Sequence, residues 1–251
     1  MTPENREVLA EAFAEVPRVD IAIDCVLAGT MGTVMVDDAG RPAAFRIAFP
    51  PFYYFAGDPG SAGGQEMVRQ QEADSLLMPS AAGWQEAFQE AHGPRLVAVE
   101  RYTFSAGALD RNHLGRLLAY SPHRKALVRL DREVATRLAA EEDGVVELSA
   151  FASIGDFLEN GGGYCLLEEG AVTGVAFSSL AHPQAVEVSI FVEPACRERG
   201  RATALGAALL DATLAQGRLP HWDAANMESV RLAEKLGYML AGPYEAHWLV
   251  I

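Results

Sequence analysis

The sequence is short of cysteine, of long apolar runs and of positive charge. Its three cysteines, Cys25, Cys165 and Cys196, are widely spaced, which excludes a disulfide framework or a zinc ribbon and favours reduced thiols. No apolar run is long enough to cross a membrane. The first residues, MTPENREVLAEAF, have neither the basic head nor the apolar core of a signal peptide. We therefore expect a cytoplasmic protein that does not act at a membrane.

Acidic residues outnumber basic ones, 34 against 20, which gives a net charge of −14. This is the wrong sign for binding a phosphate backbone by counterion release, so we expect no nucleic-acid partner. The six histidines have no paired spacing, and we expect no metal site. With 251 residues, half of them apolar, the chain can form one large domain or two modest ones.

The first half of the chain predicts an α+β domain. We place its boundary between residues 123 and 124, near Pro122, which gives domains over 1–123 and 124–251. The expected elements are a helix within residues 3–16, strands within 21–57 that are interrupted at 38–42 and at Pro50–Pro51, a helix from Gln65, a helix over GWQEAFQEAHG, a strand over RLVAVERYTF and a helix over LDRNHLGRLLAY capped by Asp110.

The second half predicts a hairpin of two strands, GYCLLEEGAVTGVAFSSL, that turns at Glu169–Gly170. The strand ALVRLD and the helical segments REVATRLAA and FASIGDFLENGG precede it. The segment VEVSIFVEP follows it, with aliphatic residues at even positions from Val186 to Val192 and a partly polar odd face. Such a strand is either half exposed or lines a cleft.

The segment RERGRATALGAALLDATLAQG predicts a helix that begins without a side-chain cap. Its apolar residues recur at helical spacing from Leu205 to Ala212. The free amides and the dipole at a helix start attract an anion, and Gly200 allows a phosphate to approach the backbone closely. We therefore predict that a bound anion caps this helix.

The loop Arg197-Glu198-Arg199-Gly200-Arg201-Ala202 resembles the Q/R-x-x-G-x-G/A signature of the Gcn5-related N-acetyltransferases, the GNAT family. The preceding strand VEVSIFV, the following PHWDA and the segment NMESVRLAEKLGY are similar to that family in the same order. The resemblance covers about residues 150–251. The sequence of this region, and more loosely the segment FYYFAGDP, also resembles the two-part branch that includes zwittermicin-resistance-type acetyltransferases.

The resemblance implies an α/β (α+β) fold, a mixed and largely antiparallel sheet flanked by helices, with the N-terminal domain as a degenerate copy. It implies acetyl-CoA as co-substrate and no metal. The amides of Arg199 to Ala202 would hold the pyrophosphate, and the preceding strand, which splays from its neighbour in this family, would bind pantetheine. The implied coenzyme-binding residues are Phe191, Val192, Arg197, Arg199, Gly200, Arg201, Ala202, Asn226 and Ser229. Judged by position alone, Asn226 is also a helix N-cap and Gly237 a C-cap.

The implied reaction moves an acetyl group to a primary amine of a small molecule. Such a reaction needs a base for the ammonium proton. Glu187 on the polar strand face is the first candidate; Glu193, and Asp223 with His221, are the alternatives.

Many family members have a tyrosine as the acid that protonates the thiolate, and Ala233 stands at that position. Tyr238, Tyr244 or Ser229 could replace it, although Tyr238 also fits a core position. The missing acid keeps open a non-catalytic acetyl-CoA sensor or interaction module. We expect a monomer or a homodimer.

Overall fold

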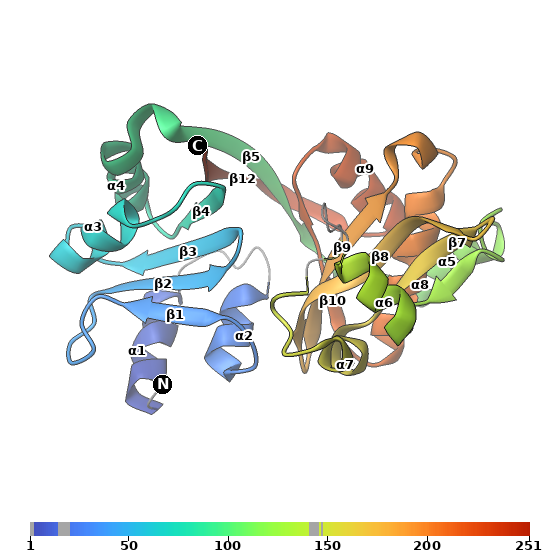
Figure 1. Ribbon diagram of the computed structural model, residues 1–251, viewed down its shortest axis with the longest axis horizontal. Helices are drawn as coiled ribbons and strands as arrows, with labels where there is room; N and C mark the ends of the chain where they lie inside the picture. The colour runs from blue at the N-terminus through green and yellow to red at the C-terminus, as the bar shows by residue number, and fades with distance from the viewer. Residues whose placement is uncertain (1–2, 15–20, 141–145, 147) are drawn as a thin grey trace. The chain divides into compact units, whose positions relative to one another are not determined.

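The computed structural model describes residues 3–14, 21–140, 146 and 148–251. Their contacts form two compact units (Figure 1). Unit 1 gathers the described parts of residues 1–18 with 22–101 and 243–251, and unit 2 gathers residue 21 with 102–242. These units group residues by their contacts and do not show which segments fold independently. The domain boundary expected between residues 123 and 124 therefore stays a prediction.

Unit 1 is an α+β structure. Its strands β1 to β3 are antiparallel, and β4 joins β3 in parallel. The elements are α1 (Pro3–Ala12), α2 (Ala22–Ala28), β1 (Thr33–Val36), β2 (Ala44–Phe49), β3 (Phe52–Gly57), α3 (Ala62–Arg69), β4 (Ser75–Pro79), α4 (Ala82–His92) and a short 3-10 turn, Gly93–Arg95.

Three expectations for this region differ from the structure or extend beyond the described residues. The strand expected from residue 21 was wrong over Ala22–Ala28, because this segment is the helix α2, which buries Ala22, Ile23, Cys25 and Val26. Helix α3 begins earlier than Gln65, since Ser61 Oγ accepts a hydrogen bond from Gly64 N (3.0 Å). Helix α1 ends at Ala12, and residues 15 and 16 of the expected helix lie outside the described residues.

Unit 2 contains the five-stranded sheet of order β10-β9-β8-β7-β6. Its elements are α5 (Arg111–Ala119), β6 (Leu127–Arg129), α6 (Arg132–Ala139), α7 (Ile154–Asp156), a π-turn (Phe157–Gly161), β7 (Gly163–Glu168), β8 (Ala171–His182), β9 (Ala185–Val192), a 3-10 turn (Pro194–Cys196), α8 (Arg201–Ala215), β10 (Leu219–His221), β11 (Asp223–Ala224) and α9 (Met227–Leu236). The strands β5 (Leu96–Ser105) and β12 (Met239–Leu249) contribute residues to both units. They belong to a seven-stranded sheet of order β1-β2-β3-β4-β12-β5-β11.

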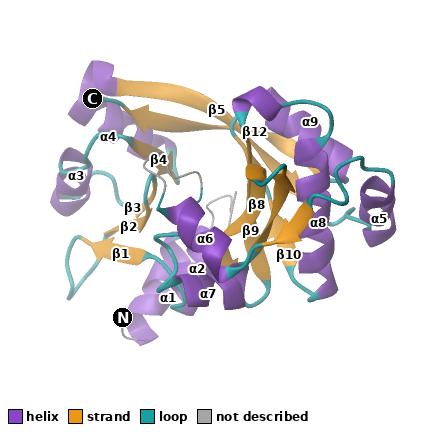
Figure 2. Ribbon diagram, turned by 45° about the vertical axis from the view of Figure 1, so that its right-hand side comes forward, coloured by secondary structure: helices purple, strands orange, loops and turns teal. Residues whose placement is uncertain are grey.

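Strands β6 to β9 are antiparallel, and β10 lies parallel to β9. The expected mixed, largely antiparallel sheet is therefore confirmed. Val186, Val188 and Val192 of β9 are buried in one core with Leu205 and Leu209 of α8. Figure 2 shows α6 on the face of β8 and β9 that lies opposite α8. The alternation expected along β9 thus separates a core face from a half-exposed face.

Strand β9 loses its parallel neighbour halfway along. Its pairing with β10 joins Ala185–Glu187 to Leu219–His221, whereas β9 continues to Val192. After Trp222 the chain enters β11, which pairs with β5 at Thr103 instead. In the part of the chain that the structure describes, β9 and its neighbour therefore separate after Glu187, as the resemblance implies.

Unit 1 repeats part of this order. The antiparallel pair β2–β3 leads through a glycine-rich segment and α3 to the parallel strand β4, as β8–β9 leads through α8 to β10. This two-part architecture fits an N-terminal domain that is a degenerate copy of the same fold. None of the helices in the described ranges is long and apolar enough to cross a membrane.

Candidate functional site

The loop between β9 and α8 has an unusual backbone. Glu198, Arg199 and Gly200 all have positive φ, of 71°, 60° and 84°. Only glycine adopts this left-handed region at no steric cost, and non-glycine residues held in it cluster at functional sites. Gly200 is the N-cap of α8 and no side chain caps the helix. The expectation of an uncapped helix start is confirmed.

The start of α8 is open to a ligand. The first hydrogen bond of the helix runs from Ala204 N to the carbonyl of Gly200 (3.0 Å), so the amides of Arg201, Ala202 and Thr203 have no partner within the helix. A Cβ added at Gly200 would meet no heavy atom of the described residues within 4 Å. Free amides, a helix dipole and open space together fit the phosphate groups of acetyl-CoA.

The three arginines of the loop have different surroundings. Arg197 Nε donates back to the carbonyl of Val192 (3.3 Å). Arg201 donates to Glu168 through Nε (2.8 Å) and to the Cys196 carbonyl through a terminal nitrogen (3.1 Å). Arg199 is exposed, and its side chain makes no hydrogen bond or ion pair within the described ranges. Arg199 is thus the arginine of this loop whose whole guanidinium is available to an anion, whereas Arg197 already uses its Nε.

Glu168, at the end of β7, connects several elements around this loop. Besides Arg201, it accepts hydrogen bonds from Thr173 Oγ1 (2.7 Å) and pairs with Nδ1 of His123 (3.0 Å). The hydrogen bond from Arg201 is the main reason that the pKa of Glu168 falls to about 2; the bonds from Thr173 and His123 add to it, and burial opposes it. This carboxylate is therefore a permanently charged acceptor beside the loop.

His123 completes this cluster from the loop after α5. It is 9% exposed, and its Nε2 lies 2.9 Å from the carbonyl oxygen of Arg199. Sequence reasoning missed both His123 and Glu168. Neither belongs to the loop motif, and no local pattern marks two residues that meet across such a sequence distance.

Asn226 and Ser229 lie at the start of α9. Asn226 Oδ1 accepts from Ser229 N (2.9 Å), and Gly237 ends the helix with a φ of 110°. Both cap expectations are confirmed. Ser229 Oγ also accepts from the indole nitrogen of Trp222 (3.2 Å). The hydroxyl hydrogen of Ser229 can still be donated, so its role and that of Asn226 toward the coenzyme stay predictions.

Glu187 lies where β9 and β10 part. It is paired in register with His221 of β10 and with Leu180 of β8, and it is half-buried. Its charge, added to the larger effect of burial, raises the pKa of Tyr238 well above 10. The Tyr238 hydroxyl donates to the carbonyl of Pro220 (3.0 Å), and the side chain is 4% exposed. Tyr238 is a buried core residue, as its position predicted.

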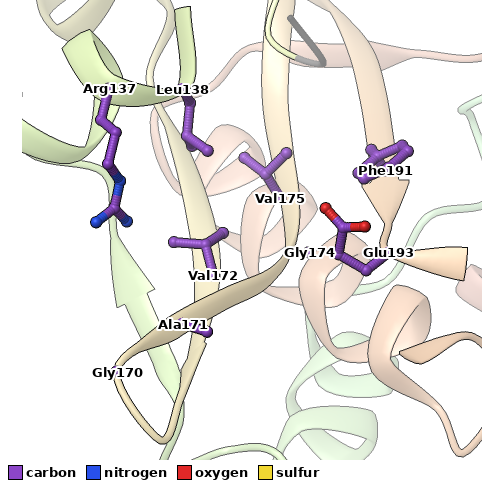
Figure 3. A pocket seen from close by; sticks show the side chains of 9 residues that line it. All are labelled: Arg137, Leu138, Gly170, Ala171, Val172, Gly174, Val175, Phe191 and Glu193. Atoms are coloured by element: carbon purple, nitrogen blue, oxygen red, sulfur yellow. The ribbon is translucent and has the colours of Figure 1, made fainter. Parts of the chain in front are cut away.

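Glu193 lies at the other end of the same strand face. It lines a cavity of about 130 Å³ with Phe191, opposite Arg137 and Leu138 of α6 (Figure 3). The cavity is completed by Gly170, Ala171, Val172, Gly174 and Val175. Along a strand, Glu187 and Glu193 are roughly 20 Å apart, so they cannot act on the same amine. Asp223 is half-buried on β11 opposite Thr103.

Ala233 is fully buried, and its carbonyl accepts the amides of Gly237 and Tyr238. Tyr244 belongs to unit 1, where its hydroxyl accepts from Arg101 Nε (3.2 Å). No group of three or more metal-ligating side chains gathers in the described ranges.

Comparison with known proteins agrees with this geometry. The family model of the GNAT acetyltransferases matches residues 11–247. A GCN5-related N-acetyltransferase-like protein from Streptococcus suis is similar in structure with a TM-score of 0.86 and 27% identity, covering 98% of both chains. A GCN5-related N-acetyltransferase from Sphaerobacter thermophilus has a TM-score of 0.55 and 14% identity, covering 98% of this chain and 93% of that one. A tandem GNAT protein from the clavulanic acid biosynthesis pathway has a TM-score of 0.52 and 16% identity, covering 97% and 92%. Among curated proteins, no relative matches. The chain belongs to the GNAT acetyltransferase family.

Proposed function

We propose that the protein transfers the acetyl group of acetyl-CoA to a primary amine of a small molecule. The observation that carries the proposal is the open start of α8, the next helix after the strand that loses its neighbour. Within the family we place the chain in the two-part branch with the zwittermicin-resistance-type enzymes. We further propose that the protein is cytoplasmic, that it is a monomer or a homodimer, and that it acts without a nucleic acid, a membrane or a metal ion.

The loop would bind the pyrophosphate through the amides from Arg199 to Ala202. The guanidinium of Arg199 would add a charge-assisted contact, while Arg197 and Arg201 hold the loop in shape. The free edge of β9 at Phe191 and Val192 would bond to the pantetheine arm. From there the pantetheine arm would run along β9 toward Glu187, and the thioester would lie where β9 and β10 part. Asn226 and Ser229 are proposed to reach the thioester end of the coenzyme.

The amine must be uncharged when it attacks the thioester carbonyl. A carbon–nitrogen bond then forms, the carbon–sulfur bond breaks, the nitrogen loses a proton and the thiolate gains one. We assign the base to Glu187 because it is half-buried at the point where the strands part. Glu193 lies too far along the strand to serve the same amine and could act only on an amine in the cavity beside Phe191.

The proton for the thiolate has two proposed sources. Tyr238 is unsuited, because its hydroxyl is buried and already donates to Pro220. Ser229 has a hydroxyl hydrogen to donate, and water is the other source. A thiol of pKa about 8.5 is a tolerable leaving group near neutrality.

The second candidate function is a non-catalytic acetyl-CoA sensor. Ala233 favours it, because the position of the usual acid is filled by a buried methyl group.

The test measures thiol release from acetyl-CoA across a panel of primary amines, together with acetyl-CoA binding by calorimetry. We expect binding and amine-dependent release, with Glu187→Gln losing release and keeping binding. Glu193→Gln is the matched control, with the same charge change on the same strand face. Binding without release for every amine, and slow hydrolysis unchanged by Glu187→Gln, would favour the sensor. Absence of acetyl-CoA binding would refute both functions.

A further inference from the structure

His123 is held between two groups that can only accept hydrogen bonds. Its Nδ1 lies 3.0 Å from Glu168 Oε1, and its Nε2 lies 2.9 Å from the Arg199 carbonyl oxygen. Glu168 stays ionised, since Arg201 and Thr173 also donate to it. A neutral imidazole donates from one nitrogen only. Both bonds therefore form only when both ring nitrogens of His123 carry a proton.

The bond to Arg199 sets the direction of the next amide. A trans peptide unit is planar, with the carbonyl and the following N–H pointing in opposite directions. When the Arg199 carbonyl points at His123, the N–H of Gly200 points away from His123. Arg199 is a non-glycine residue in the left-handed region, with φ of 60°, and such a conformation persists only where neighbouring contacts hold it.

We propose that His123 is a positioning residue, which links Glu168 to the Arg199 carbonyl and thereby aims the Gly200 amide at the diphosphate of the coenzyme. The inference rests on the proposed binding of acetyl-CoA at this loop. Glu168 contacts both sides of this arrangement. Its carboxylate holds the His123 ring through Nδ1 and holds the start of α8 through Arg201. His123 itself is not expected to touch the reacting atoms.

A matched control exists in the same unit. His113 Nε2 also bonds to a backbone carbonyl, that of Lys235, at 2.9 Å, but at the end of α9 and not at the loop. His123→Ala and His113→Ala each remove one histidine and one such bond. Thermal unfolding of both variants reports any general loss of stability, and His123→Gln keeps an amide that can donate to the Arg199 carbonyl.

The first measurement is the ring state of His123, from nitrogen NMR of the protein without ligand near neutral pH. We expect a proton on Nε2, the nitrogen that faces the Arg199 carbonyl. The second is the dissociation constant of CoA, by calorimetry. We expect His123→Ala to weaken CoA binding at least about tenfold, which is the scale of one charge-assisted hydrogen bond. His113→Ala should change it less than about twofold, and His123→Gln should recover part of the loss.

The third measurement compares CoA with S-acetylpantetheine, which lacks the diphosphate, by NMR titration. Positioning of the loop predicts that His123→Ala weakens CoA alone; a general packing defect would weaken both. A His123 ring without a proton on Nε2, or an unchanged affinity of His123→Ala for CoA, would overturn the inference while the wild-type protein still binds CoA. If the wild-type protein binds no CoA, the proposed function fails as well, and that outcome differs from every failure of the inference alone.

Discussion

Asp37 Oδ2 accepts a hydrogen bond from the Ser61 hydroxyl (3.2 Å) at the start of α3. In the same place, Asp37 Oδ1 accepts the amides of Ala43 and Ala44 (2.8 and 3.1 Å), and Ser61 caps α3. A Cβ added at Gly63 would meet the Asp37 Cβ at 2.2 Å. Side chains of unit 1 thus fill the helix start that corresponds to the open start of α8.

We expect each chain to bind one acetyl-CoA, because the start of α8 is open, whereas side chains fill the corresponding start of α3. Calorimetry on the full chain should give a stoichiometry of one, and substitutions in the α8 loop should weaken the whole signal. Two equivalents per chain, or binding that survives loss of the α8 loop, would show that unit 1 also holds a site despite Asp37.

Gly200→Ala should weaken acetyl-CoA binding at least about tenfold, or about 1.4 kcal/mol. The added methyl group would enter the open space at the helix start, and alanine tolerates a φ of 84° poorly. Gly217→Ala is the matched control: its φ is 73°, it also has no neighbour within 4 Å in the described chain, and it follows the other end of α8.

Both substitutions should lower the free energy of unfolding by about 1–2 kcal/mol, the cost of a left-handed alanine. Urea unfolding measures this cost, and calorimetry measures binding. Equal binding losses in both variants would show that stability and not access to the loop is responsible.

The sequence predicted those parts of the site that depend on local patterns. The caps at Asn226 and Gly237 follow from side-chain and backbone preferences of single residues, and the two faces of β9 follow from alternation. The helix α2 was missed because a short apolar segment does not distinguish a helix from a strand by its periodicity; in the structure, the buried residues of α2 have helical spacing.

The cluster of His123, Glu168 and Arg201 could not be predicted for a different reason. It joins a loop, a strand end and a helix start that are far apart in the sequence, and neither His123 nor Glu168 belongs to a recognisable motif. The motif predicted all three arginines of the loop as coenzyme-binding residues. In the structure, Arg201 instead donates a hydrogen bond to Glu168, and Arg199 is exposed. Which residue an arginine of this loop contacts depends on how the strands and helices pack in three dimensions.

Asn226→Ala should lower the free energy of unfolding by about 1 kcal/mol, since the amide of Ser229 loses its acceptor. Asn226→Asp should restore stability, because aspartate caps a helix equally well. Urea unfolding provides the measurement. A coenzyme contact through the Asn226 amide group would show as weaker acetyl-CoA binding in both variants, including the stable one; unchanged binding in Asn226→Asp would leave Asn226 as a cap alone.

Acid should destabilise unit 1 through His92, whose ring is bound in the opposite way to that of His123. Its Nδ1 faces the Arg95 guanidinium (3.1 Å), a donor, and its Nε2 faces the Val68 carbonyl (2.9 Å), so the ring fits when neutral. Burial is the main cause that lowers its pKa below 6.5; the bond to Val68 opposes this, and the charge of Arg95 adds to it.

The unfolded chain therefore takes up a proton at His92 at a higher pH than the folded protein does. Stability from this group is complete above pH 6.5 and is lost as the pH falls below that value toward the lowered pKa of the folded state. Urea unfolding between pH 8 and pH 5 should show this decline. Since burial also lowers the pKa of His247, His92→Gln should flatten the decline without abolishing it; a decline unaffected by His92→Gln would assign it to other groups.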